Sequence, residues 1–225
     1  QYCDTGRDRI DQNNHDLKGR AMRLFGTPQW GSDIVEYQLA LYGLDYEFVQ
    51  TGNLFETLGA HDALTEANPL RQIPTLILDD GTVMTESAAI TLLLADITGD
   101  DRLVPAAGTP ERADFLRWLV FLVANIYPTY TFVDLPERFV EVEAAQAPFR
   151  EAVHAYARKL YGQVEGAIAG PWFLGDRFSA LDVYMCVMSR WTPRRDWHRE
   201  NCPKIARIAE AVDALPELKA LVART

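Results

Sequence analysis

Two short stretches carry residue types that could bind a ligand through main-chain groups. The first is Gln72-Ile73-Pro74-Thr75, in which a proline stands directly before strand-forming residues. An Ile-Pro bond adopts the cis form at a much lower cost than a non-proline bond, so this proline can fix a turn that exposes main-chain groups. The alternative is a proline that only ends a loop.

The second stretch is Glu86-Ser87, at the expected start of a helix. The first amides of a helix have no intrahelical acceptor, and the helix dipole favours a negative charge there. An anion could therefore bind at Ser87. Alternatively, the same serine is only a helix cap.

The elements that must position these stretches alternate between strand and helix from Met22 to residue 98. Ser32 is expected to cap a helix that ends near Gly43, because serine is favoured at the N-cap and glycine just after the C-terminus. Asn68-Pro69 ends the next helix, and Asp80-Gly81 predicts a tight turn between two strands. The expected order is βαβαββα, with strands at 22–26, 44–50, 75–78 and 82–84 and helices at 32–42, 55–67 and from 87 onward.

The rest of the chain has the pattern of a helical bundle. Beyond residue 110, apolar residues recur at three- and four-residue spacing, as at Phe115, Leu119 and Val123. Ser179 and Asp182 have the spacing of a capping box at the start of one helix. We therefore expect a flexible tail at 1–21, a first domain at 22–98, a linker at 99–109 and an all-helical domain at 110–225.

Composition narrows the class of protein. The 225 residues carry a formal net charge of −10, which argues against binding to nucleic acid or to an anionic membrane. Cys3, Cys186 and Cys202 are too few for a disulfide framework, and no apolar run approaches the roughly 20 residues of a spanning helix. A cytoplasmic location with free thiols is expected. The histidines show no metal-site spacing, so no metal is expected.

Several motifs stand in a fixed order over residues 22–222, and their order and spacing are more specific than any one of them. They are the strand and turn at 22–27, Gly43-Leu44, Asn68-Pro69, Gln72-Ile73-Pro74-Thr75, Thr85-Glu86-Ser87-Ala88-Ala89-Ile90, and Phe173-Leu174-Gly175-Asp176 leading into Phe178-Ser179-Ala180-Leu181-Asp182. In this order the chain resembles the cytosolic glutathione S-transferase family of the bacterial type. The resemblance implies an α/β plus all-α fold: a thioredoxin-like N-terminal domain (βαβαββα), then a helical-bundle C-terminal domain. It also implies a homodimer.

The resemblance assigns glutathione, as a co-substrate, to the two stretches. The main chain of Ile73, next to Gln72 and held by a cis Pro74, would pair with the cysteinyl part of glutathione. Ser87 and the helix start would hold the γ-glutamyl carboxylate, and Glu86 would help to place the α-amino group.

A glutathione transferase must favour thiolate over thiol, because the thiolate is the nucleophile. A hydrogen-bond donor aimed at the sulfur does this, and family members place it between the first strand and the first helix. This loop reads Thr27-Pro28-Gln29-Trp30-Gly31-Ser32. Gly31 aligns with the cysteine of cysteine-dependent members, so a cysteine-centred mechanism is not expected. Ser32 is the predicted sulfur contact, with Thr27, Gln29 and the amides of 30–32 as alternatives.

Tyr127 is the second predicted catalytic residue. It aligns with the active-site histidine of the cysteine-dependent members, and its hydroxyl could donate to a thiolate or to an electrophile. Alternatively, it is an aromatic residue that fills the domain interface. Trp30, Tyr130 and Trp191 are predicted to line a pocket for a hydrophobic electrophile, and Pro128 predicts a kink nearby.

An arginine cluster follows the helix that starts near Asp182. Arg190, Arg194 and Arg195 are expected to close that helix. They could bind a carboxylate or form a solvated helix end.

The predicted activity is attack of glutathione thiolate on a hydrophobic small molecule. Glutathione-dependent ether cleavage, dehalogenation or isomerisation would use the same site. The alternative is a non-catalytic module that binds glutathione or a protein, which the lack of a Cys, Tyr or Ser at the usual loop positions favours.

Overall fold

The N-terminal domain is built on a mixed sheet. The computed structural model describes residues 21–55 and 62–224, and structural statements refer to these. The strands are β1 (Met22–Gly26), β2 (Tyr46–Gln50), β3 (Thr75–Ile77) and β4 (Val83–Met84), in the spatial order β2-β1-β3-β4. β1 runs parallel to β2 and antiparallel to β3, which is antiparallel to β4. The predicted tail at 1–21 lies outside the described residues, except for residue 21.

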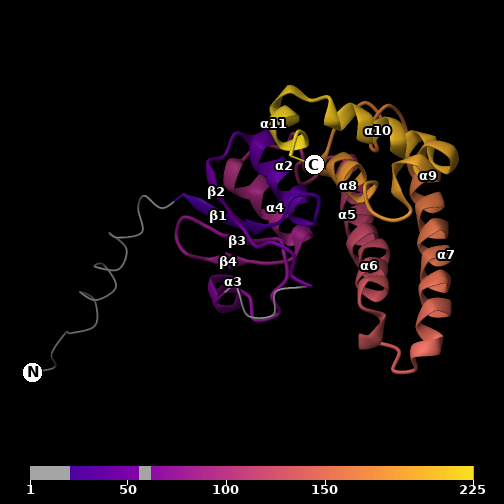
Figure 1. The fold of residues 1–225 in the computed structure, drawn as a ribbon. Helices are drawn as coiled ribbons and strands as arrows, with labels where there is room; N and C mark the ends of the chain where they lie inside the picture. Colours follow the sequence, from indigo (N-terminus) through magenta and orange to yellow (C-terminus); the bar gives the residue numbers. More distant parts are fainter. Residues whose placement is uncertain (1–20, 56–61, 225) are drawn as a thin grey trace, which may run out of the picture.

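Two helices cover this sheet, and a hydrophobic core lies between the sheet and these helices. α2 (Ser32–Tyr42) and α4 (Ser87–Thr98) pack against each other, while the short α3 (Asp62–Ala67) leads toward β3 (Figure 1). Leu24 of β1 and Leu76 of β3 point toward the helices, and their neighbours Phe25 and Thr75 are buried as well, so burial does not simply alternate along these two central strands. The buried cluster between sheet and helices consists of Leu24, Val35, Leu39, Leu76, Ile90 and Leu94.

The observed order is βαβαββα, so the predicted fold class is confirmed, and the differences lie at element ends. β2 begins at Tyr46 instead of residue 44, because Gly43 (φ 68°) and the amide of Leu44 close α2, the latter by donating to the Leu39 carbonyl at 3.0 Å. The strands predicted at 75–78 and 82–84 are shorter. Of the helix predicted at 55–67, Phe55 lies in a turn, residues 56–61 are outside the described residues, and α3 forms the rest.

The prediction that Ser32 caps α2 is wrong. Gly31 occupies the N-cap position, and Ser32 is the first helical residue. The hydroxyl of Ser32 bonds back to Thr27 instead of forward to the helix amides. A serine before an apolar helix therefore serves here to hold the preceding loop and does not cap the helix.

In the described residues the C-terminal part is built of helices, apart from its loops and two isolated β-bridges, Trp172 with Gly175 and Leu174 with Arg177. Its elements are α5 (Glu111–Phe121), η1 (Leu122–Ile126, a π-helical turn), α6 (Tyr127–Asp134), η2 (Pro136–Arg138), α7 (Glu143–Ala167), α8 (Ala180–Met188), α9 (Arg194–Asn201), α10 (Pro203–Asp213), η3 (Pro216–Leu218) and α11 (Lys219–Val222). All nine residues of α8 are buried, which makes it the centre of this part. The boundaries 22–98, 99–109 and 110–225 stay a prediction.

The predicted capping box at the start of α8 is confirmed. Asp182 is fully buried and accepts the amide of Ser179 at 2.8 Å. The same carboxylate accepts the amide of Phe173 at 2.7 Å, so it ties the preceding turn to the helix. Burial raises the pKa of Asp182 to about 7, against these amide hydrogen bonds.

The two parts share one helix. On α2, Val35 and Leu39 face the sheet, whereas Ile34, Tyr37 and Leu41 belong to the large cluster of the helical part. The end of the chain returns to α2 as well, where Arg224 forms a 2.6 Å ion pair with the buried Glu36 (Figure 1). α2 is therefore the element through which the helical part can act on the N-terminal loop.

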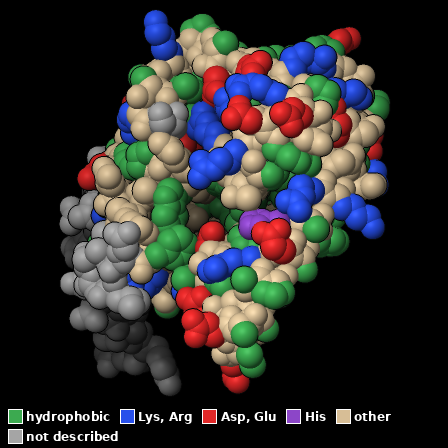
Figure 2. All heavy atoms as spheres, turned by 45° about the vertical axis from the view of Figure 1, so that its right-hand side comes forward, with side chains coloured by type: hydrophobic (Ala, Val, Ile, Leu, Met, Phe, Trp, Pro, Cys, Tyr) green, Lys and Arg blue, Asp and Glu red, His purple; other side chains and the backbone are tan. Residues whose placement is uncertain are grey.

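The surface carries charged side chains of both signs. Basic and acidic side chains are mixed over the face shown in Figure 2. None of the helices within the described ranges is both long and apolar enough to cross a bilayer.

Candidate functional site

The loop between β1 and α2 is fixed by its own hydrogen bonds. Ser32 is fully buried, and its Oγ accepts the amide of Thr27 at 3.0 Å and donates to the carbonyl of Thr27 at 2.9 Å. The Thr27 hydroxyl donates to the Gly52 carbonyl at 2.6 Å. A serine hydroxyl has one proton, so that of Ser32 is already used inside the loop.

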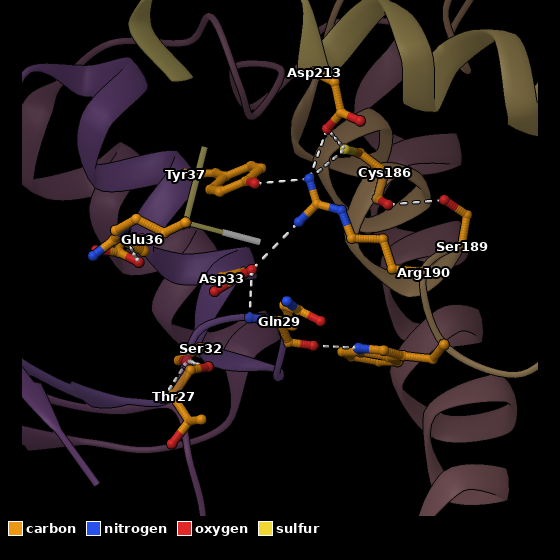
Figure 3. A network of polar contacts seen from close by, with 12 residues as sticks. Thr27, Gln29, Ser32, Asp33, Glu36, Tyr37, Cys186, Ser189, Arg190 and Asp213 are labelled. Atoms are coloured by element: carbon orange, nitrogen blue, oxygen red, sulfur yellow. Dashed lines mark hydrogen bonds and ion pairs between the residues drawn. The ribbon is translucent and has the colours of Figure 1, made fainter. Parts of the chain in front are cut away.

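Gln29 is held on both sides of its main chain (Figure 3). Its amide donates to Asp33 Oδ2 at 3.0 Å, and its carbonyl accepts the indole N–H of Trp191 at 2.8 Å. Its φ is 70°, an unusual value for a residue with a side chain. The two hydrogen bonds hold this turn, and one of them comes from the helical part.

Gly31 leaves room for the hydroxyl of Tyr127. A Cβ added at Gly31 would overlap the Tyr127 hydroxyl oxygen, and it would lie 3.5 Å from the carbonyl oxygen of Ile73. The tyrosine hydroxyl thus takes the space in which any larger side chain at position 31 would begin. Burial raises the pKa of Tyr127 far above its usual value, so the hydroxyl keeps its proton. Among the described residues, none forms a hydrogen bond with it.

A π-helical turn delivers Tyr127 to this position. The expected kink near Pro128 takes the form of η1, which ends where α6 begins at Tyr127. Because α5, η1 and α6 follow one another without a break, Pro128 lies inside a continuous helical run, where the amide proton that proline lacks leaves a gap in the hydrogen-bond ladder next to the π-helical turn. The extra residue in a π-helical turn changes which side chains face the N-terminal domain, as is common at functional sites.

Three of the predicted aromatic residues meet here. The ring of Trp191 lies edge-on to Tyr127 and Tyr130, with centroid distances of 5.3 and 4.9 Å. The hydroxyl of Tyr130 forms a hydrogen bond with that of Tyr161, so it points toward α7. Trp30 instead packs against Phe55, with the two rings tilted and 5.0 Å between their centroids.

The tract before β3 contains the expected cis peptide bond, and side-chain hydrogen bonds hold it in place. The Ile73-Pro74 peptide is cis, as predicted. The carbonyl of Gln72 accepts from Thr75 Oγ1 at 2.7 Å and from Asn68 Nδ2 at 3.1 Å. Asn68 is 5% exposed and ties both ends of the turn together. The sequence pattern marks Asn68 only as the end of a helix, before Pro69.

Glu86 and Ser87 stand at the start of α4. Glu86 has φ 63° and ψ 104° and is exposed, whereas Ser87, the first helical residue, is buried. The first amides of the helix are therefore presented beside an exposed carboxylate.

The arginine cluster binds carboxylates of the chain itself (Figure 3). α8 ends at Met188, so the expectation that all three arginines close it is wrong: Arg194 and Arg195 begin α9. Arg190 contacts Asp33 at 3.3 Å and Asp213 at 2.7 Å, and donates to the Tyr37 hydroxyl at 2.8 Å. Arg195 pairs with Asp213 as well.

Asp33 links this network to the loop. It is 2% exposed, and burial raises its pKa to about 6, although the Gln29 amide and the guanidinium of Arg190 oppose the rise. Asp33 and Arg190 lie 157 residues apart, and no local pattern pairs them. Within residues 21–55 and 62–224, no group of three or more His, Cys, Asp or Glu side chains is placed to hold a metal ion.

Comparisons with known proteins agree with the fold. A family model for the N-terminal domain of glutathione S-transferase matches residues 32–97. The uncharacterized GST-like protein YncG of Escherichia coli K12 is 38% identical over 206 residues, covering 90% of this chain and 98% of that protein.

Solved structures give the same result. A glutathione transferase from Methylococcus capsulatus has a TM-score of 0.74 at 28% identity, covering 90% of this chain and 98% of its own. A glutathione transferase homologue from Sulfitobacter, with bound glutathione, has a TM-score of 0.80 at 22% identity and covers 91% of this chain and 98% of its own, so it shares the fold. Because the likeness to YncG extends over nearly all of both chains, this protein belongs to the bacterial-type glutathione S-transferase family.

Proposed function

We propose that the chain is a glutathione transferase in which the Tyr127 hydroxyl stabilises the thiolate of glutathione. The observation that carries the proposal is the place of that hydroxyl, in the space where a side chain at Gly31 would begin. Gly31 aligns with the cysteine of cysteine-dependent members. The tyrosine would therefore bring a donor from the helical part to a position that other members fill from the loop.

Glutathione would bind along the turn and the helix start. The main chain of Ile73, flanked by Gln72 and Pro74, would pair with the cysteinyl part of glutathione. Ser87 and the first amides of α4 would hold the γ-glutamyl carboxylate, and Glu86 would face the α-amino group. The glutathione bound in the Sulfitobacter homologue, which has the same fold, supports this proposal.

In the proposed reaction, the thiol of glutathione gives up its proton to solvent and the thiolate accepts a hydrogen bond from Tyr127. Hydrogen bonding to the charged form lowers the thiol pKa. A sulfur lone pair then forms the bond to an electrophilic carbon. The displaced electron pair leaves with the leaving group or, in an addition, goes to a neighbouring atom that takes up a proton.

Ser32 becomes the weaker candidate for the sulfur contact. Its proton goes to the Thr27 carbonyl, so it could serve the sulfur only if that hydrogen bond broke. We therefore propose that Ser32 shapes the loop. The electrophile would rest on the rings of Tyr127, Tyr130 and Trp191, which are large and apolar. Trp30 stays a predicted pocket residue.

The decisive experiment compares Tyr127→Phe with wild type. We expect the pKa of bound glutathione, measured from thiolate absorbance, to rise by about 1–2 units, because one donor to the charged form is lost. Turnover of a chloronitrobenzene at pH 6.5 should fall roughly 10- to 100-fold. The Kd for glutathione should stay within about twofold, since Tyr127 is not proposed to hold the backbone of the tripeptide.

Gly31→Ala supplies a matched control for the same hydroxyl. Its methyl group would displace the Tyr127 oxygen, so it should imitate Tyr127→Phe, and the double variant should be no worse than either single one. Additive losses would show that Gly31 and Tyr127 act separately. If Ser32→Ala abolishes turnover in a folded protein and Tyr127→Phe does not, Ser32 is the donor.

A second candidate is a non-catalytic module that binds glutathione or a protein. It is favoured by a loop with no cysteine and with the Ser32 proton already used. In that case immobilised glutathione would retain the protein, and no product would form with any chloronitrobenzene or isothiocyanate.

We also propose an assembly and a location for the protein, both typical of the family. A homodimer is expected, which light scattering after size-exclusion chromatography would reveal as twice the chain mass of 25.4 kDa. A cytoplasmic location is supported by Cys186 and Cys202, which are free thiols.

A further inference from the structure

A buried tyrosine of the helical part contacts the serine proposed to hold glutathione. Tyr184 lies on α8 and is fully buried, and its hydroxyl donates to Ser87 Oγ at 2.9 Å. Ser87 is the first residue of α4 and is 8% exposed. The contact therefore joins the centre of the helical part to the proposed anion site, across 97 residues of sequence.

The hydrogen bonds around Ser87 have defined donors and acceptors. Thr91 Oγ1 donates to the Ser87 carbonyl at 2.9 Å and accepts from Gln38 Nε2 at 2.9 Å, so Thr91 has no proton left for Tyr184. Tyr184 gives its proton to Ser87 Oγ. Among the residues described, the proton of Ser87 has no acceptor of its own. Burial raises the pKa of Tyr184 to about 12, so this donor is protonated at neutral pH.

We propose that Tyr184 is a positioning residue that directs the Ser87 hydroxyl proton to the γ-glutamyl carboxylate of glutathione. The inference rests on the proposed function, which places Ser87 at that carboxylate. A hydroxyl that already accepts a hydrogen bond is polarised and donates a stronger one. Tyr184 also occupies one lone pair of Ser87, so it restricts the directions in which the remaining proton can point. Being fully buried, Tyr184 acts through Ser87 and not by touching the ligand.

The test compares glutathione with an analogue that lacks only that carboxylate. 4-Aminobutanoyl-cysteinylglycine keeps the rest of the tripeptide. We expect Tyr184→Phe to raise the Kd for glutathione about five- to tenfold in calorimetric titrations, which is the loss of one hydrogen bond that strengthens on binding an anion. The Kd for the analogue should change less than about twofold.

Two further variants provide controls. Tyr46→Phe also removes a tyrosine hydroxyl, one that donates to Glu36 at 3.0 Å instead of to Ser87, and should leave both Kd values unchanged. In a Ser87→Ala background, Tyr184→Phe should have no further effect on glutathione binding. Thermal unfolding of each variant checks that the fold is retained.

The outcomes separate this inference from the proposed function. If wild type binds glutathione and Tyr184→Phe binds it equally well, or loses affinity for glutathione and the analogue alike, only the inference is overturned. If wild type does not bind glutathione, the proposed function falls and the inference falls with it. A loss confined to glutathione supports both.

Discussion

His198 is a buried residue whose chemistry neither the proposed reaction nor the fold explains. It is fully buried on α9, with its ring 4.6 Å from that of Tyr161 and 5.2 Å from that of Trp197. Neither ring nitrogen has a hydrogen-bond partner within the described part of the chain. Burial, with a smaller effect from Arg195, lowers the pKa of His198 from 6.5 to about 4.

This shift predicts a loss of stability in acid that is specific to His198. Between pH 6.5 and about 4 the unfolded chain holds a proton on this residue that the folded chain does not, so the free energy of unfolding falls as the pH falls. Relative to His198→Phe, wild type should lose roughly 3 kcal/mol between pH 7 and pH 4 in urea titrations. The variant is the reference because Asp33 and Asp182, whose pKa values are raised, change stability in the opposite sense.

The control for this prediction is an aromatic residue at the surface. Tyr156, 51% exposed, can be changed to Phe, and its difference from wild type should not depend on pH. A constant difference between wild type and His198→Phe over the same range would show that the buried imidazole does not remain neutral.

At the scale of elements, the loop between β1 and α2 depends on a carboxylate–guanidinium pair between domains. Asp33 accepts the Gln29 amide and Arg190, while Arg190 also reaches Asp213 (Figure 3). Removing the guanidinium leaves the buried Asp33 carboxylate with one amide partner and raises further a pKa that burial already holds at about 6. Breaking such a buried pair is costly, even where the intact pair adds little stability.

Arg190→Met should therefore lower the free energy of unfolding by about 3 kcal/mol and raise the KM for glutathione. Adding Asp33→Asn removes the stranded charge while keeping an oxygen for the Gln29 amide. The double variant should recover at least half of the lost stability in urea titrations. A double variant that is less stable than Arg190→Met would mean that Asp33 stabilises α2 without needing its partner.

Local patterns in the sequence predicted most elements and the cis Ile73-Pro74 bond correctly, because both depend on neighbouring residues. Pro74 and the Ser179 capping box are of this kind. The cap at Ser32 was wrong because the serine hydroxyl had a second local partner, Thr27, that the pattern does not weigh. The pairing of Asp33 with Arg190, and the contact of Tyr184 with Ser87, depend on the packing of α8 against α2 and α4, which no short motif encodes. Tyr127 was found by alignment, and Gly31 was the available sign of the space for its hydroxyl.

At the scale of the whole molecule, α2 belongs to two cores at once. Ile34 packs in the helical cluster and Leu39 in the sheet cluster, and both are fully buried. Separating the two parts would expose one face of this helix. Each part is thus stabilised by burying one face of α2, so unfolding of α2 would remove apolar contacts from both parts.

We expect the protein to unfold as a single cooperative unit for this reason. Tryptophan fluorescence, which reports mainly on the helical part because four of the five tryptophans lie there, should give the same urea midpoint as hydrogen exchange of the β1 amides. Ile34→Ala should lower both midpoints together, with a loss of about 3 kcal/mol. Leu39→Ala, which opens a cavity on the other face, is the matched control and should also lower both. If Ile34→Ala shifted only the tryptophan signal, the two parts would be independent units, and effects of Tyr184 or Arg190 on glutathione binding would need a route other than α2.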